Sequence, residues 1–195
     1  MGPLRYVYAV TIATPSVQSA IDLMRVVAKP DTRRRAHLTL RGPYAEPLPA
    51  AVQTEVAATV ADAPISVGGA GSFFGPSQST IFVRCDGDVL RSVWDKPGLG
   101  YTPHLTVYDG EDREFASRLL SALEAHPFLL DARLGELEEM EVGAPRPGVP
   151  LLELGADRWS SELFGSRIEN SELIDLDSDE RVALIARIAE RLRAG

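Results

Sequence analysis

The chain has 195 residues, 45% of them hydrophobic, with 28 Asp and Glu against 20 Lys and Arg and a formal net charge of −8. This length and apolar content suit a folded domain with a short appendage and exclude wholesale disorder. The acidic balance argues against binding DNA duplexes through their phosphates, so an anionic ligand needs a local positive pocket. The single cysteine excludes a disulfide framework and a cysteine-rich zinc site.

The first residues and the cysteine usage indicate where the protein works. Residues 1–6 lack the charged region and apolar run of a signal peptide, and no apolar stretch approaches membrane-spanning length. One cysteine fits a reducing compartment. We therefore expect a cytoplasmic protein without a membrane partner.

Apolar periodicity and helix breakers predict alternating strands and helices in the first half of the chain. We expect strands at residues 6–13, 36–41, 65–67 and 80–85, and helices at 16–28 and 49–61. Ser16 is the expected N-cap of the first helix. A turn at residues 42–43 and a glycine-rich loop at residues 68–76 are expected to separate later elements.

The second half follows a similar order. We expect a short helix at residues 89–94, a longer helix at 111–125, and strands at 104–108, 128–131, 136–142 and 149–154. This order of elements predicts an α+β domain with two related lobes over residues 1–158.

Residues 159–195 form the predicted tail. Asp177 and Glu180 have the spacing of a capping box, which marks the start of a closing helix. Apolar residues then recur on one helical face: Val182, Ile185, Ile188 and Leu192. Because the other face is charged, the helix is expected to dock on the domain, or on a second copy in a homo-oligomer.

Two segments share a His-apolar-Thr-apolar pattern: residues 37–40 (His-Leu-Thr-Leu) and residues 104–107 (His-Leu-Thr-Val). Both lie on predicted strands, where residues two apart face the same side. The expected faces are those of His37, Thr39 and Arg41 and of His104, Thr106 and Tyr108. If the halves are related by a pseudo-two-fold axis, the two faces line one cleft, in which Tyr108 is expected to contact a nucleoside.

This set of side chains suits a phosphate ester. A neutral imidazole can take a proton from an attacking water, while an imidazolium protonates the departing oxygen. Two threonine hydroxyls can donate hydrogen bonds to the non-bridging oxygens, where negative charge builds. The arrangement requires neither a metal nor a cofactor.

The paired motifs resemble those of the 2H phosphoesterases, a group that includes bacterial RNA ligases and cyclic phosphodiesterases acting on 2′,5′ linkages and 2′,3′-cyclic phosphates. The resemblance covers about residues 4–158. It implies a bilobal α+β fold in which two antiparallel sheets flank a central groove and helices lie outside. It also implies His37 and His104 as catalytic residues, with Thr39 and Thr106 binding phosphate. Arg41 departs from the family pattern and is interpreted as an extra phosphate contact or as rim charge.

The resemblance implies a metal-independent phosphodiesterase acting on 2′,3′-cyclic phosphates, 2′,5′-linked or cyclic nucleotides, or RNA ends. In reverse, the same groups can seal a 2′,5′ bond. By analogy with the family His104 is the general base and His37 the general acid, although two identical motifs do not by themselves order these roles. The alternative is a module that binds an RNA end or a nucleotide in the same groove without turnover.

Other features have plainer interpretations. Cys85 lies in a mostly apolar predicted strand and is expected to be a buried small hydrophobe. His126 follows a helix and is interpreted as a C-terminal helix charge. The phenylalanines at 73–74 are expected either to stack on a base or to pack on the domain. The arginines at 33–35 supply either a positive field for the substrate or a solvated charge run.

Overall fold

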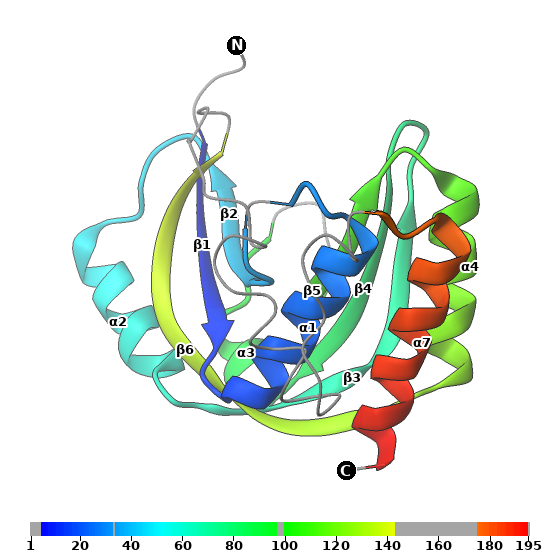
Figure 1. The fold of residues 1–195 in the computed structure, drawn as a ribbon. Coiled ribbons are helices and arrows are strands. Elements are labelled where there is room, and N and C mark those ends of the chain that lie inside the picture. The colour runs from blue at the N-terminus through cyan, green and yellow to red at the C-terminus, as the bar shows by residue number, and fades with distance from the viewer. Residues whose placement is uncertain (1–4, 33, 97–99, 143–174, 195) are drawn as a thin grey trace.

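The computed structural model describes residues 5–32, 34–96, 100–142 and 175–194. Over these ranges the chain forms six strands and five helices in an α+β arrangement (Figure 1). In chain order they are β1 (Arg5–Ile12), α1 (Pro15–Ala28), β2 (Leu38–Tyr44), α2 (Ala50–Val60), β3 (Pro64–Phe74), β4 (Ser79–Asp86), α3 (Asp88–Val93), β5 (His104–Gly110), α4 (Arg113–Ala125), β6 (Leu129–Val142) and α7 (Ser178–Ala194). The strand expected at 149–154 and the expected boundary after residue 158 lie outside the described residues.

All six strands join in one closed antiparallel sheet, in the order β1-β2-β5-β4-β3-β6. Strand β6 was expected as two strands but is continuous: residues 129–133 pair with β3 and residues 134–142 with β1. Strands β2 and β5, which carry the two motifs, meet at the registered pair Leu38 and Leu105. The α+β class is confirmed, whereas the division into two sheets stays a prediction.

Two strands run through segments that the sequence predicted as a loop or a turn. Strand β3 continues through the expected glycine-rich loop to Phe74 and pairs with β4 along its length, with a bulge between Val67 and Ala70. A Cβ added at Gly71 would lie 2.4 Å from the ring of Phe82, so glycine lets this ring pack directly on the backbone. Strand β2 likewise runs through the turn expected at residues 42–43.

The helix starts differ in detail from the prediction. Helix α1 is capped by Thr14 rather than Ser16, and Pro15 occupies its first turn, where the missing N–H costs no hydrogen bond. Helix α4 begins after Asp112, whose Oδ1 accepts a hydrogen bond from the Phe115 N–H at 2.9 Å.

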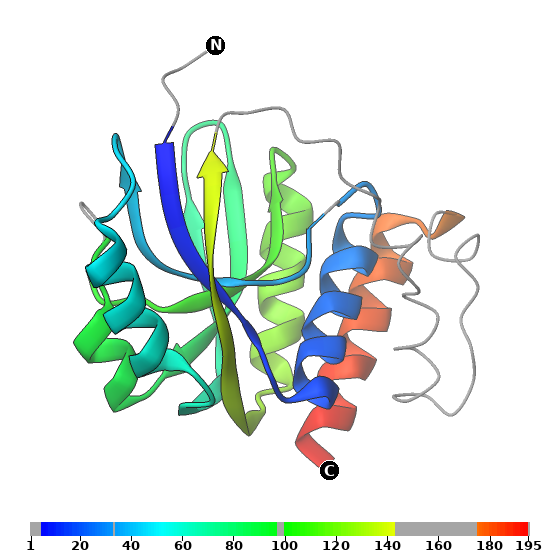
Figure 2. The same ribbon diagram turned by 90° about the vertical axis from the view of Figure 1, so that its left-hand side faces the viewer.

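The closing helix α7 docks on the domain. Its capping box is confirmed, because the Asp177 N–H donates to Glu180 Oε2 at 2.8 Å and the Glu180 N–H donates to Asp177 Oδ1 at 2.9 Å. Ile185 and Ile188 are fully buried where α7 lies alongside α1 and α4 (Figures 1 and 2). Along the described parts of the chain, no helix has both the length and the apolar character to cross a membrane.

Candidate active site

The crossing of β2 and β5 brings the two motifs together. Leu38 pairs with Leu105 in antiparallel register, so the residues next to this pair also face each other: His37 lies opposite Thr106 and Thr39 opposite His104. These four side chains are half-buried, whereas the two leucines of the pair are fully buried in the core. Leu40 and Val107 are fully buried as well, so the predicted alternation holds over all four residues of each motif.

Both histidines make the same backbone hydrogen bond. His37 Nδ1 lies 2.9 Å from the carbonyl oxygen of Arg35, and His104 Nδ1 lies 2.7 Å from the carbonyl oxygen of Thr102. A carbonyl can only accept a hydrogen bond, so each Nδ1 carries the proton and each neutral ring has its lone pair on Nε2. Within the described chain neither Nε2 has a hydrogen-bond partner. Each ring is thus held in one tautomer with Nε2 available for proton transfer.

Burial lowers the pKa of His37 below its ordinary value. The positive charges of Arg25 and Arg34 lower it further, while the hydrogen bond to the Arg35 carbonyl and the carboxylate of Glu138 raise it. Strand register supports this placement of Glu138. Ala9 of β1 pairs with Glu138 on one side and with Thr39, two residues after His37, on the other.

Burial also lowers the pKa of His104. The hydrogen bond to the Thr102 carbonyl raises it, whereas the positive charges of Lys96 and of protonated His37 lower it. The charge of one imidazole therefore acts on the other. Every side-chain charge that acts on His104 favours its neutral form.

The threonine hydroxyls are available for a ligand. Thr39 pairs with Ala9 of β1, and Thr106 pairs with Phe82 of β4. Neither hydroxyl bonds to another protein group in the part of the chain that the structure describes. Each can therefore donate a hydrogen bond to an anion on this face.

Aromatic rings flank His104. The ring centroid of Phe82 lies 4.6 Å from that of His104, and Phe73 meets the imidazole edge-to-face at 5.4 Å. Phe82 is buried, but Phe73 remains 36% exposed beside the histidine. Phe74 turns instead to Arg113, whose guanidinium lies 4.9 Å from its ring centroid. Among the aromatic side chains that the structure describes, only Phe73 therefore combines exposure with ring contact to a motif histidine.

Arg41 and Tyr108 leave the motif faces, contrary to the prediction from strict alternation. Each motif strand has one extra residue at its fourth motif position, Leu40 in β2 and Val107 in β5, so that the register with the neighbouring strand shifts. Arg41 Nε donates to the carbonyl oxygen of Val93 at 2.9 Å, at the end of α3.

Tyr108 is correspondingly only 7% exposed and packs edge-to-face on Phe115 in the core, with ring centroids 5.0 Å apart. The predicted phosphate and nucleoside contacts of these two residues therefore have no support from their positions.

Besides Arg25, two charged residues near the motifs were missed from the sequence. Lys96 is half-buried over the ring of Trp94, with Nζ 5.5 Å from the centroid, and burial lowers its pKa. Glu138 lies in β6, roughly a hundred residues from the motif on which it acts. A lone lysine after a short helix and one glutamate among several carry no local signal. Sheet register places Glu138, and the path of the chain between α3 and β5 places Lys96.

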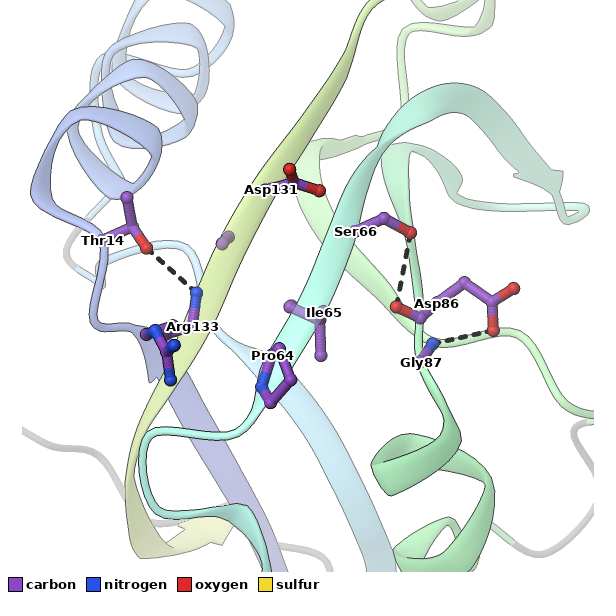
Figure 3. A pocket seen from close by; sticks show the side chains of 9 residues that line it. Thr14, Pro64, Ile65, Ser66, Asp86, Gly87, Asp131 and Arg133 are labelled. Atoms are coloured by element: carbon purple, nitrogen blue, oxygen red, sulfur yellow. Dashed lines mark hydrogen bonds between the residues drawn. The ribbon is translucent and has the colours of Figure 1, made fainter.

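A separate cavity lies away from the motifs. An open hollow of about 580 Å³ is lined by Thr14, Pro64, Ile65, Ser66, Asp86, Gly87, Asp131, Ala132 and Arg133 (Figure 3). None of these residues belongs to a motif, and Arg133 is already bonded to Asp62 at 3.0 Å. Asp86 is likewise paired with Arg91 at 2.9 Å, so the lining offers a phosphate anion no unpaired cation. No three His, Cys, Asp or Glu side chains gather as a metal ion would need, as far as the described residues extend.

The comparison with known families agrees with this geometry. The sequence profile of the 2′-5′ RNA ligase superfamily matches residues 14–143, which include both motifs and the strands that carry them. A comparison with curated proteins gives no match. The profile covers about two thirds of the chain, and this superfamily is part of the 2H phosphoesterases. The chain therefore belongs to the 2′-5′ RNA ligase superfamily of 2H phosphoesterases.

Proposed function

We propose that the protein is a metal-independent phosphodiesterase that hydrolyses 2′,3′-cyclic phosphates or 2′,5′-linked or cyclic nucleotides, free or at an RNA end. The observation that carries the proposal is the matched pair of Nδ1 bonds, to the carbonyls of Arg35 and Thr102. These bonds hold two imidazoles in the same tautomer and leave both Nε2 atoms for proton transfer. A binding module has no need for two such groups.

The reaction follows from the four motif side chains. One histidine Nε2 takes a proton from water as the water oxygen forms a bond to phosphorus. The other Nε2–H gives its proton to the ribose oxygen as the bond between that oxygen and phosphorus breaks. Thr39 and Thr106 donate hydrogen bonds to the non-bridging oxygens, on which charge increases in the transition state. Protons balance, since one imidazole gains the proton that the other loses.

The surrounding charges favour His104 as the base and His37 as the acid. Lys96 acts on His104 and disfavours its protonation. Glu138 acts on His37 and favours the protonated form that a general acid needs. This difference in surrounding charge supports an assignment of acid and base that the two identical motifs do not provide.

We infer that the substrate lies in a groove between two walls of the closed sheet. One wall comprises β1, β2 and the second part of β6, and the other comprises β5, β4, β3 and the first part of β6. The change of partner along β6 and the single registered pair between β2 and β5 support this division. Phe73 is the ring that we propose stacks on a base, since it is exposed beside His104. Lys96 and Arg34 supply local positive charge in an acidic chain.

The test is turnover by the purified full chain of a panel of 2′,3′-cyclic mononucleotides, 2′,5′-linked and 3′,5′-linked dinucleotides, and RNA with a cyclic phosphate end. We expect hydrolysis of at least one cyclic or 2′,5′-linked substrate and none of the 3′,5′-linked control. His37→Ala and His104→Ala are each expected to lower turnover by about 10²–10⁴-fold.

The remaining histidine provides a matched control. His126 lies at the C-cap of α4, outside the candidate site, so His126→Ala should keep full turnover. Nucleotide binding without turnover by the wild-type chain would overturn the proposal in favour of a binding module. Turnover that survives in either motif-histidine variant would overturn it as well.

A further inference from the structure

Helix α1 carries a polar stripe on a buried face. Gln18, Asp22 and Arg25 are spaced four and three residues apart, so they lie on one side of the helix, and Lys29 follows at its C-cap. The first three are only 2%, 0% and 8% exposed. A buried helical face is normally apolar, and each buried polar group must find a partner.

The first part of the stripe holds the segment that precedes His37. Gln18 Nε2 donates to the Ala36 carbonyl at 2.9 Å, and the Ala36 N–H donates to Asp22 Oδ1 at 2.6 Å. Asp22 Oδ2 also accepts a hydrogen bond from Arg35 Nε at 2.9 Å. Both backbone groups of the residue before His37 are therefore bonded to α1.

Arg25 reaches both motif segments. Its Nη1 donates to the carbonyl of Thr106 at 3.1 Å, and its Nε donates to the carbonyl of Arg34 at 3.3 Å. Nη2 lies 3.7 Å from the carboxylate of Asp109, just after the second motif. The planar guanidinium suits this task, because its donors form a rigid fork.

The two motif strands need such a link. Strands β2 and β5, both fully described, share the single registered pair Leu38 and Leu105. One backbone pair leaves the angle between two strands weakly defined. Misplacement by about 1 Å of groups that act together can lower a rate by about 10²-fold.

We propose that Arg25 is a positioning residue that fixes the two histidine motifs relative to each other by bonding to the backbone of both. It touches neither motif side chain through these bonds. The inference rests on the proposed function for its effect on turnover, but its effect on the strand crossing is independent of any activity.

Arg25 also acts on His37 through its charge. The side-chain charges that act on His37 come from Arg25 of α1, Arg34 of the preceding segment and Glu138 of β6, and His37 in turn acts on His104 of β5. Removing the Arg25 charge takes away one cation that disfavours the imidazolium, so the pKa of His37 should rise. A purely structural role would not move this pKa in a charge-dependent way.

The experiment compares Arg25→Met, Arg25→Lys and Lys29→Met in the full chain. Lys29, at the C-cap of α1, also bonds to Asp109, at 2.8 Å, but its side-chain bonds reach only the second motif segment. We expect Arg25→Met to lower kcat by about 10²-fold with little change in KM. The limb of the pH profile that belongs to His37 should move to higher pH. Arg25→Lys should also lower kcat but leave that limb in place, because lysine keeps the charge without the fork.

Amide hydrogen exchange at Leu38 and Leu105 provides a readout without turnover. We expect exchange at both amides to be about tenfold faster in Arg25→Met and unchanged in Lys29→Met. Wild-type kcat and exchange in a folded Arg25→Met chain would overturn the proposal. If that variant does not fold, wild-type kcat and exchange in Arg25→Lys would overturn it. A wild-type chain without turnover, but with faster exchange in the Arg25 variants, would instead contradict only the proposed function.

Discussion

The docking of α7 predicts a large loss of stability when one buried isoleucine is shortened. Ile188 is fully buried between α7 and its neighbours α1 and α4. Replacing a buried isoleucine with alanine costs about 2–5 kcal/mol, from lost burial and from the cavity left behind. We take about 3 kcal/mol for Ile188→Ala, a large part of the 5–15 kcal/mol that is usual for a folded domain.

The assay is urea unfolding followed by circular dichroism, together with a thermal melt. A loss of about 3 kcal/mol in a chain of this length should lower Tm by about 6–12 °C. Leu129→Ala is the control, because Leu129 is 74% exposed on β6 and should change the free energy of unfolding by less than about 1 kcal/mol. Equal effects of the two substitutions would refute the reasoning.

Protein concentration separates docking on the domain from docking on a second copy. A helix that packs on α1 and α4 of its own chain gives an unfolding midpoint that is independent of concentration. A helix exchanged between copies gives a midpoint that rises with concentration, because association is then linked to folding. Such a rise would contradict the intramolecular packing and favour the homo-oligomer expected as the alternative.

Four further outcomes test the site and the burial of Cys85. Thr39→Val and Thr106→Val keep the strand shape but remove the hydroxyl, so each should lower kcat by about 10²-fold without changing Tm. An unchanged kcat in both variants would contradict the phosphate-binding assignment. In the pH profile, kcat/KM should fall at low pH as the base is protonated and at high pH as the acid is deprotonated. Both limbs should lie on the acid side of about 6.5, because burial lowers the pKa of both motif histidines. Activity should persist in EDTA, and loss restored by zinc or manganese would contradict the paired-histidine mechanism. Burial raises the pKa of Cys85 to about 12, so the native thiol should resist iodoacetamide and Cys85→Ala should keep turnover, whereas rapid labelling of the folded chain would contradict its burial.

The sequence predicted those features that depend on local pattern. The capping box at Asp177 and the apolar face of α7 follow from spacing along one helix, and both are present. The alternation of His104 and Thr106 with buried neighbours follows from the period of one strand. In each case the information lies within a few residues of the feature itself.

Features that depend on a partner strand were beyond local pattern. Arg41 and Tyr108 turn away from the motif faces because β2 and β5 each bulge against a neighbour, and a bulge is a property of a pair of strands. Gly71 suggested a loop, yet it allows the Phe82 ring to pack on β3. Arg25 lies in a helix without a distinctive motif. Its partners are backbone carbonyls, which every residue type carries, so the sequence does not indicate them.

The likeness of the two halves extends beyond the motif letters, while their surroundings differ. In both halves Nδ1 bonds to the carbonyl two residues earlier, and in both a bulge falls three residues after the histidine. A matched backbone of this kind presents two equivalent imidazoles, which alone give no reason for one to act as acid and the other as base. The difference must come from elements outside the motifs, and Glu138 acts on His37 whereas Lys96 acts on His104. Exchanging these charges by Glu138→Lys and Lys96→Glu should therefore alter the pH limbs of the two histidines in opposite directions, raising the pKa of His104 and lowering that of His37.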